Sequence, residues 1–297
     1  MEKTILSLLL LLNLLLCGCG KKTETPIPEA KVEPEQVEKT EEKKESKAIS
    51  APNMAAIESY QYTWSENDVM PPIVIIIDDF GQNAGQLLDD FSALPAKISF
   101  AILPDLPYTQ TVARLAEKTK HNVLIHIPMQ AIDHNANPGK RFLKTGMDKY
   151  EISSLLQDFY AQIPNAVAAN NHMGSEVTSD LTAMNIILEE LDELGLYFLD
   201  SATINKSAAF TAAKNLGLKI AKRDIFLDVP DNSDATIISK IEGLAKYKGR
   251  KEPVVIITHC HNREKLNALQ KFLTQIDNMG IELMSVEELF RQLGSPA

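Results

Sequence analysis

After residue 70 the chain contains several short runs in which every position is apolar. The run 73–77 is a clear example, and such a run is typical of a parallel strand that is covered on both faces. Similar runs recur at 98–103, 123–127, 166–169, 196–199, 218–221 or 225–227, 254–257 and 281–284. Amphipathic stretches typical of helices lie between most of them, at 152–163, 180–194, 235–247 and 263–279. The pattern predicts strands that alternate with helices.

Seven or eight such β/α units within residues 71–295 favour an α/β fold with one domain. We expect a distorted (β/α) barrel of seven or eight units with mostly parallel strands. A doubly wound open sheet is the alternative. Both architectures place active-site groups where strands end and lead into helices.

The start of the chain carries the pattern of an export signal. An apolar run of about 12 residues follows Lys3, which is too short to span a bilayer but fits the core of a signal peptide. The sequence Leu-Cys-Gly-Cys at 16–19 resembles a bacterial lipobox. We therefore expect residues 1–18 to be a signal peptide and Cys19 to carry lipid, with an ordinary secretory signal as the alternative. This predicts an exported lipoprotein, anchored to a membrane through Cys19, that faces the periplasm or the cell exterior.

The segment after the lipobox is rich in charge. Residues 20–50 include seven Lys and eight Glu but no aromatic residue. Such a segment buries too little apolar surface to offset its ordering entropy, so residues 19–70 are expected to form a lipidated N-terminus and a disordered linker. With Cys17 removed and Cys19 lipidated, Cys260 remains alone, and no intramolecular disulfide is expected.

Composition and charge exclude several classes of function. The 297 residues are 44% hydrophobic and 24% charged, which is ordinary for a globular protein. With 30 Lys plus Arg against 40 Asp plus Glu, the net charge is 30 − 40 = −10, so we expect no nucleic-acid partner. No G-x-G-x-x-G or Walker loop follows the first strand, so we expect no nucleotide, and no G-x-S-x-G supports a serine nucleophile.

Polar residues gather where the predicted strands end. The first strand ends in Asp78 and Asp79. Four of the six histidines also fall at strand ends, namely His126, His172, His259 and His261. Further polar residues at these ends are Asn171, Ser175, Asp200, Arg223 and Asp228. Because His and Asp are costly to bury unless they are paired or bind a metal, their gathering at one rim predicts a polar site.

Structural roles compete with functional ones at single positions. Asp79 is a favoured helix N-cap residue, and His126 taken alone is typical of a hydrogen-bonded core histidine. Cys260 beside His259 is either a thiol nucleophile or, as we favour, a buried inert cysteine. The set as a whole offers a carboxylate and two imidazoles, which leave part of a Zn²⁺ shell open for water, as catalytic zinc requires. A second carboxylate could accept a proton from that water, and a further histidine could protonate a leaving amine.

The chain from about residue 73 to residue 293 resembles the divergent polysaccharide deacetylases, a branch of the glycoside hydrolase/deacetylase β/α-barrel superfamily. The segments that carry the resemblance are IIIDDFG at 75–81, AILP at 101–104, HIPMQ at 126–130, NNHMGS at 170–175, YFLDS at 197–201 and RDIFLD at 223–228. The resemblance implies that Asp78 acts as a base, that Asp79 and His126 bind a divalent metal, and that His259 acts as an acid.

The chain departs from the better-known polysaccharide deacetylases at two places. Gln130 stands where their second histidine ligand would be, and His172 is our candidate for that ligand. The R-x-P-Y motif is absent from the sequence, and Arg223 is the candidate to replace its arginine, which steadies the base. We expect Asn171, Ser175, Asp200, Arg223 and Asp228 to contact the substrate or to support the ligands.

These expectations define one hypothesis and two alternatives. The hypothesis is a metal-dependent hydrolase, with Zn²⁺ held by Asp79, His126 and His172, that removes acetyl groups from N-acetylated cell-envelope glycans such as peptidoglycan. The long loop 131–147 is expected to form one wall of the glycan groove. The alternatives are a noncatalytic glycan-binding or scaffold lipoprotein and a metal phosphoesterase. The acidic balance and the single metal cluster disfavour the phosphoesterase, because such enzymes often use paired ions.

Overall fold

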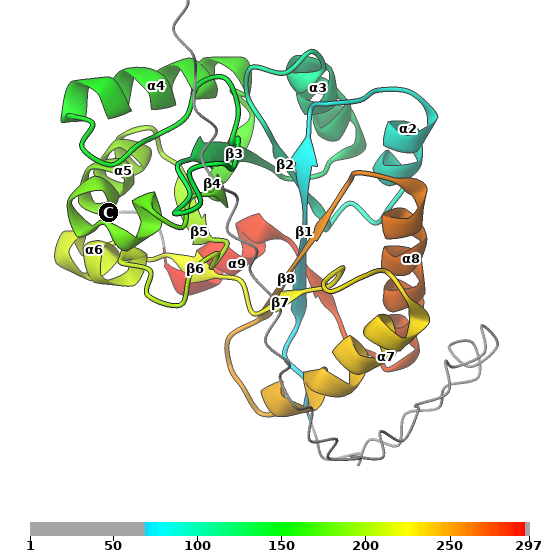
Figure 1. Cartoon of the computed structure of the whole chain (residues 1–297). Helices are drawn as coiled ribbons and strands as arrows, with labels where there is room; N and C mark the ends of the chain where they lie inside the picture. Colours follow the sequence, from blue (N-terminus) through cyan, green and yellow to red (C-terminus); the bar gives the residue numbers. More distant parts are fainter. Residues whose placement is uncertain (1–68, 295–297) are drawn as a thin grey trace, which may run out of the picture. The chain divides into compact units, whose positions relative to one another are not determined.

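The computed structural model describes residues 69–294, in which strands and helices alternate (Figure 1). The strands are β1 (Ile73–Phe80), β2 (Ser99–Ile102), β3 (Val123–Met129), β4 (Ala166–Met173), β5 (Tyr197–Asp200), β6 (Ala221–Lys222), β7 (Ile225–Phe226), β8 (Val254–His259) and β9 (Leu283–Met284). The helices are α2 (Gln86–Ser92), α3 (Thr109–Thr119), α4 (Lys149–Gln162), α5 (Leu181–Glu193), α6 (Ala209–Leu216), α7 (Asp234–Gly243), α8 (Arg263–Asn278) and α9 (Val286–Leu293). The predicted signal peptide and the predicted lipidation of Cys19 lie outside these residues. So does the predicted linker, apart from the last positions of the linker, 69 and 70.

All pairings among these strands are parallel, in the order β6-β5-β4-β3-β2-β1-β8-β7, and β9 adds to the start of β1. One short segment, residues 221–226, joins the two ends of this order. Its first half pairs with β5 through Leu199 and Ala221, and its second half pairs with β8 through Ile225 and Ile256. The prediction of a distorted, mostly parallel (β/α) barrel is therefore confirmed. The two candidate runs for the sixth strand, 218–221 and 225–227, each contribute to this bent segment.

The two faces of the strands bury two different clusters. Alternate residues such as Ile73, Ile75 and Ile77 pack against the outer helices, whereas Val74 and Ile76 face inward. Helix α9 lies inside the curl of the strands in Figure 1, and its Val286, Leu289 and Phe290 pack on this inner set. The inner face is therefore apolar near the start of the strands, and the continuing alternation brings Asp78, His126 and Asn170 to its other end.

The helix boundaries follow from local capping. Asp148 and Ser285 begin α4 and α9 with capping boxes. In each box the side chain of the capping residue accepts from the third helical N–H, and the Glu at that third position accepts from the backbone N–H of the capping residue. Asp180 begins α5, where its carboxylate accepts from two backbone N–H groups. No helix within residues 69–294 is long and apolar enough to cross a membrane.

Several strands run further than predicted. β1, β3, β4 and β8 continue through the polar residues that we expected just past their ends. The hydrogen-bonded ladder therefore fixes the backbone of Asp78, His126, His172 and His259 directly. Side chains on such a ladder hold their positions better than side chains on loops.

Candidate metal centre and active site

An irregularity in β1 brings both aspartates into the site. Between Ile77 and Phe80 the β1 chain advances three residues while β2 advances two, from Phe100 to Ile102, which is the arrangement of a β-bulge. Asp79 has φ 70°, in the left-handed region that costs free energy for a residue other than glycine. Regular alternation would send neighbouring carboxylates to opposite faces, and the bulge allows both to reach one site.

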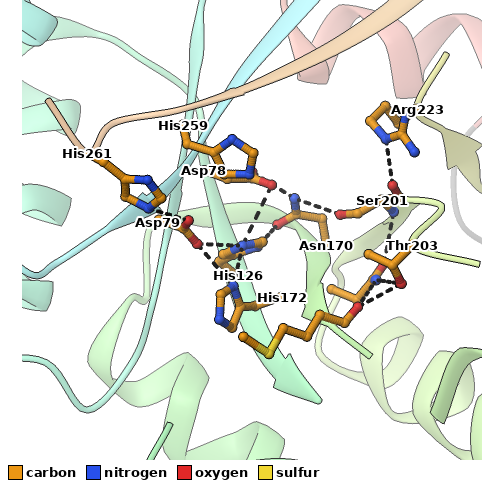
Figure 2. Close-up of polar contacts among 12 residues, drawn as sticks. Asp78, Asp79, His126, Asn170, His172, Ser201, Thr203, Arg223, His259 and His261 are labelled. Carbon is orange, nitrogen blue, oxygen red and sulfur yellow. Dashed lines mark hydrogen bonds and ion pairs between the residues drawn. The ribbon is translucent and has the colours of Figure 1, made fainter. Parts of the chain in front are cut away.

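Three potential metal ligands converge at the carboxyl ends of β1, β3 and β4. The Oδ1 atom of Asp79 lies 3.2 Å from Nε2 of His126 and 3.0 Å from Nδ1 of His172, and these two nitrogens are 3.2 Å apart (Figure 2). Bond lengths of about 2.0–2.1 Å and tetrahedral angles put neighbouring zinc ligands about 3.3 Å apart. The spacing of the three atoms is therefore close to that of three corners of a tetrahedral zinc site.

A buried oxygen without a hydrogen bond supports the same interpretation. Oδ1 of Asp79 is buried and has no hydrogen-bond partner, although two imidazole nitrogens lie beside it. Leaving a buried carboxylate oxygen unpaired is costly unless a cation satisfies it. Carboxylate oxygen and imidazole nitrogen are both common zinc ligands, so the residues present fit a bound Zn²⁺ or a similar ion.

Asn170 fixes the orientation of the His126 ring. Its Nδ2 donates to Oδ1 of Asp78 at 2.9 Å, so its Oδ1 faces Nδ1 of His126 at 2.8 Å (Figure 2). An amide oxygen can only accept, so Nδ1 of His126 carries a hydrogen, and Nε2 is the nitrogen that offers its lone pair to a cation when the ring is neutral. Such a hydrogen bond to the remote nitrogen of a ligating histidine is the usual support of a metal site.

His261 holds the other oxygen of Asp79. Its Nε2 lies 2.7 Å from Oδ2, while Oδ1 faces His126 and His172. The three histidines reach this carboxylate from β3, β4 and the loop after β8. His261 therefore fixes the rotation of the carboxylate that directs Oδ1 toward the two imidazoles.

Electrostatics favours opposite charges in this cluster. Burial opposes the charge of Asp79, but the imidazoles of His126, His172 and His261 outweigh it and hold the pKa of Asp79 well below its usual range. Burial likewise opposes the charge of His126, but Asp78 and Asp79 outweigh it and raise the pKa of His126 to about 9. The carboxylates thus favour a positive charge at the centre of the cluster.

Asp78 lies beside this centre and stays separate from the three ligands. Its Oδ2 is 3.6 Å from Nε2 of His126, and its Oδ1 accepts from Asn170. The pKa of Asp78 is raised because burial outweighs the effects of His126, His259 and the Asn170 hydrogen bond. His259 pairs with it in register across β1 and β8.

His259 is oriented by a buried acid. Its Nδ1 lies 2.9 Å from Oδ2 of Asp228, which also contacts the Lys265 ammonium. Burial opposes the charge of His259, but Asp228 outweighs it and raises the pKa of the imidazole. The pKa of Asp228 falls to about 2, because bonds from His259 and Lys265 outweigh its own burial. This pairing occupies Nδ1 of His259 and leaves Nε2 for other partners.

The remaining predicted residues brace the backbone around the site. Asn171 accepts from the N–H of Ser201 at 2.8 Å and donates to the carbonyl of Met173 at 2.7 Å. Ser175 accepts from the N–H of Ile132, and Asp200 accepts from the N–H of Ala202. Asn171 and Ser175 thereby join neighbouring strand ends, whereas the Asp200 bond lies within the turn after β5.

Arg223 does not hold Asp78 as we expected it to. Its guanidinium donates to the carbonyls of Ser201 at 2.6 Å and Ala202 at 2.8 Å and lies 3.6 Å from the centre of the Phe226 ring. The neutral amide of Asn170 forms the bond to Asp78 instead. Arg223 acts on Asp78 through longer-range electrostatics, and burial lowers the pKa of Arg223.

A cleft of about 480 Å³ opens beside the cluster. Its lining includes Asp79, His172 and His261 of the site and residues 137–141 of the loop 131–147. Arg141 fixes this loop through paired bonds of 2.8 and 2.7 Å to Asp105 and a further bond to Asp158. The loop therefore forms one wall of a groove at the site, as the sequence predicts.

The fold and the site together define an α/β barrel with a carboxylate and two imidazoles poised to hold a cation. Residues 75–290 match the family described as divergent polysaccharide deacetylase, and the chain belongs to this family.

Two relatives with similar sequences are uncharacterized proteins. YibQ of Escherichia coli (strain K12) is 37% identical over 192 residues, which cover 64% of this chain and 58% of YibQ. A protein of Haemophilus influenzae is 32% identical over 188 residues, which cover 63% of this chain and 66% of the relative. The similarity thus spans less than two thirds of the length of either relative.

A solved structure supports the fold. The crystal structure of an uncharacterized protein from Agrobacterium tumefaciens C58 matches with a TM-score of 0.67 at 21% identity, over 77% of this chain and 93% of that protein. It has the same fold.

Proposed function

We propose that this protein is a metal-dependent hydrolase that removes N-acetyl groups from cell-envelope glycans. One observation carries the proposal: in a member of the divergent polysaccharide deacetylase family, Asp79 Oδ1, His126 Nε2 and His172 Nδ1 lie within 3.2 Å of one another. His172 takes the role that a second histidine of the family motif would have, while Gln130 at that motif position accepts from the backbone of Thr145.

Asp79, His126 and His172 would hold the cation, for which we propose Zn²⁺. A cation there would polarise the carbonyl of the acetamide and lower the pKa of a bound water. Asp78 is the proposed base, because its carboxylate lies 3.6 Å from a ligand nitrogen while its other oxygen is held by Asn170. From that position it could accept the proton that water loses as it attacks the acetamide.

His259 is the proposed acid. Asp228 holds its Nδ1, so that Nε2 can deliver a proton to the amine that leaves the sugar. Asp228 and Lys265 form the fixed support that keeps the ring in this orientation. Asp78 and His259 would thus act on the two ends of the same reaction, one taking a proton and the other giving one.

The glycan would lie in the cleft of about 480 Å³ along the loop 131–147. Polar side chains such as Asn137 and Lys140 line it and could bond sugar hydroxyls. The proposed location agrees with such a substrate: the signal-like residues 1–18 and Cys19 favour an exported protein, anchored by lipid and facing the periplasm or the cell exterior.

The proposal is tested by assay of acetate release from N-acetylglucosamine oligomers and from peptidoglycan. We expect release by the zinc-loaded protein, loss of release with a chelator, and recovery when zinc is restored. The variant His172→Ala should lack activity. Binding of the oligomers without acetate release would contradict the proposal and favour the noncatalytic glycan-binding alternative.

A further inference from the structure

A second hollow adjoins the metal cluster. It has a volume of about 220 Å³ and lies between the loop after β1, helix α2 and the loop after β8. Asp79, Gln82 and His261 line both this hollow and the larger cleft. The two spaces therefore meet at the carboxylate that would hold the cation.

The two spaces differ in chemistry. The larger one carries three charged side chains that the smaller one lacks, those of Asp105, Lys140 and Arg141, beside apolar side chains such as Leu103 and Leu106. The smaller one has a floor of apolar side chains, which are Phe80, Leu87, Leu88 and Phe91. Cys260 also lines the smaller hollow, and burial raises the pKa of its thiol, so the thiol stays uncharged.

An N-acylated sugar has the same division into a polar part and an apolar part. The sugar is polar, the acyl chain is apolar, and the amide that joins them is the bond to be cleaved. With the amide carbonyl at the cation that Asp79 would hold, the sugar side faces the charged side chains of the larger cleft and the acyl side has the apolar hollow beside it. Burial of an apolar chain there is favourable, because it removes apolar surface from water.

The size of the hollow exceeds what an acetyl group requires. A volume of 220 Å³ is about seven times the roughly 30 Å³ that a water molecule, comparable in size to a methyl group, occupies in the liquid. Each further methylene buried in such a space contributes a factor of about four to affinity.

We propose that the hollow lined by Leu87, Leu88, Phe91 and Cys260 is an acyl-binding site, and that it accepts N-acyl chains longer than acetyl. The inference rests on the proposed function, because it assigns the acyl half of the same substrate. It makes Leu87, which is half-buried on α2, the residue that determines how long an acyl chain the hollow accepts.

The test is binding of the free acids, which are the products of the reaction. Acetate, butanoate and hexanoate are titrated into the zinc-loaded full chain in a calorimeter. We expect the affinity to rise about fourfold for each methylene until the hollow is filled. An affinity that does not change from acetate to hexanoate overturns the proposal.

Variants at Leu87 test whether the dependence of affinity on chain length arises in this hollow. Leu87→Trp fills the hollow and should remove the rise from acetate to hexanoate, and the near-isosteric Leu87→Asn should weaken it by making the wall polar. The matched control is Leu216→Trp on α6, an exposed leucine that is not part of the hollow, which should keep the dependence on chain length. A dependence that both Leu87 variants retain, while circular dichroism shows them folded, overturns the assignment.

Failure of this inference differs from failure of the proposed function. Zinc-dependent acetate release together with an affinity independent of chain length contradicts the acyl site alone. A rise in affinity with chain length, lost in the Leu87 variants, without hydrolysis of any acylated sugar, contradicts the hydrolase and supports the acyl site.

Discussion

The amide oxygen of Asn170 lies 2.8 Å from Nδ1 of His126, and both side chains are buried. This contact sets which nitrogen of His126 faces Asp79. Substitution of Asn170 by Ala removes it and should weaken zinc binding by about 10–100-fold, the usual cost of losing such a support. Competition with a chromophoric chelator measures the change. Asn165→Ala, which removes a side-chain bond to the carbonyl of Ala113 away from the site, is the control and should bind zinc as the wild type does.

A second prediction concerns His261. His261→Ala frees Oδ2 of Asp79 and lets the carboxylate rotate, so zinc affinity should fall about tenfold. His261→Gln keeps a donor for that oxygen and should recover part of the loss. The control His134→Ala removes an exposed histidine that pairs with Glu176. Equal zinc affinity of His261→Ala and the wild type would show that Asp79 is held without His261.

Gly174 shapes the turn after His172. Its φ is +81°, and an added Cβ would lie 2.9 Å from the Cβ of Met129. Gly174→Ala should therefore lower the free energy of unfolding by about 2–3 kcal/mol, through backbone strain and the clash. Gly195→Ala is the matched control, because it has φ +72° with open space around it and should cost about 1 kcal/mol. Urea denaturation measures both, and equal losses would contradict the clash.

The pairing of Asp105 with Arg141 in the wall of the cleft should make the free energy of unfolding depend on pH. Paired hydrogen bonds from Arg141 hold the pKa of Asp105 below its usual value, despite partial burial. A lowered pKa means that the stabilisation is fully present above about pH 4, the unfolded value, and is lost as pH falls through the lower folded value. Asp105→Asn should cost about 1–2 kcal/mol at pH 7.

This difference from the wild type should shrink in acid. Denaturation of both proteins between about pH 7 and pH 3 tests it. The control Asp133→Asn changes an aspartate of the loop 131–147, the loop that also holds Arg141. The Asp133 side chain bonds only within its own turn, to Asn135. A difference between wild type and Asp105→Asn that is constant with pH would exclude the pairing with Arg141 as its cause.

The sequence was sufficient to predict the barrel because its strands are buried on both faces. Runs such as 73–77 and 254–257 are apolar at every position, and the outer helices and α9 cover the two faces. The pairing of residues 221–226 with β5 and then β8 was not predictable. The two short runs near each other in sequence suggest alternative positions for one strand, whereas in the structure one run pairs with β5 and the other with β8.

The site was predictable as a gathering of side chains but not in its details. The rule that strand ends meet at one edge brings Asp79, His126 and His172 together. Asn170 was missed in favour of Asn171, although it has the same parity along β4 as His172 and therefore faces the same side. The bulge in β1 has no signal in the sequence, because Asp78 and Asp79 are neighbours that regular alternation would separate.

The central claim is that Asp79, His126 and His172 hold one cation. The most direct test is the zinc content of His172→Ala, because this histidine is the ligand that departs from the better-known motif. Purified wild-type protein, dialysed against zinc and then against buffer, should keep one zinc per chain, while folded His172→Ala should keep less than about a tenth of that. One zinc per chain in His172→Ala would contradict the account.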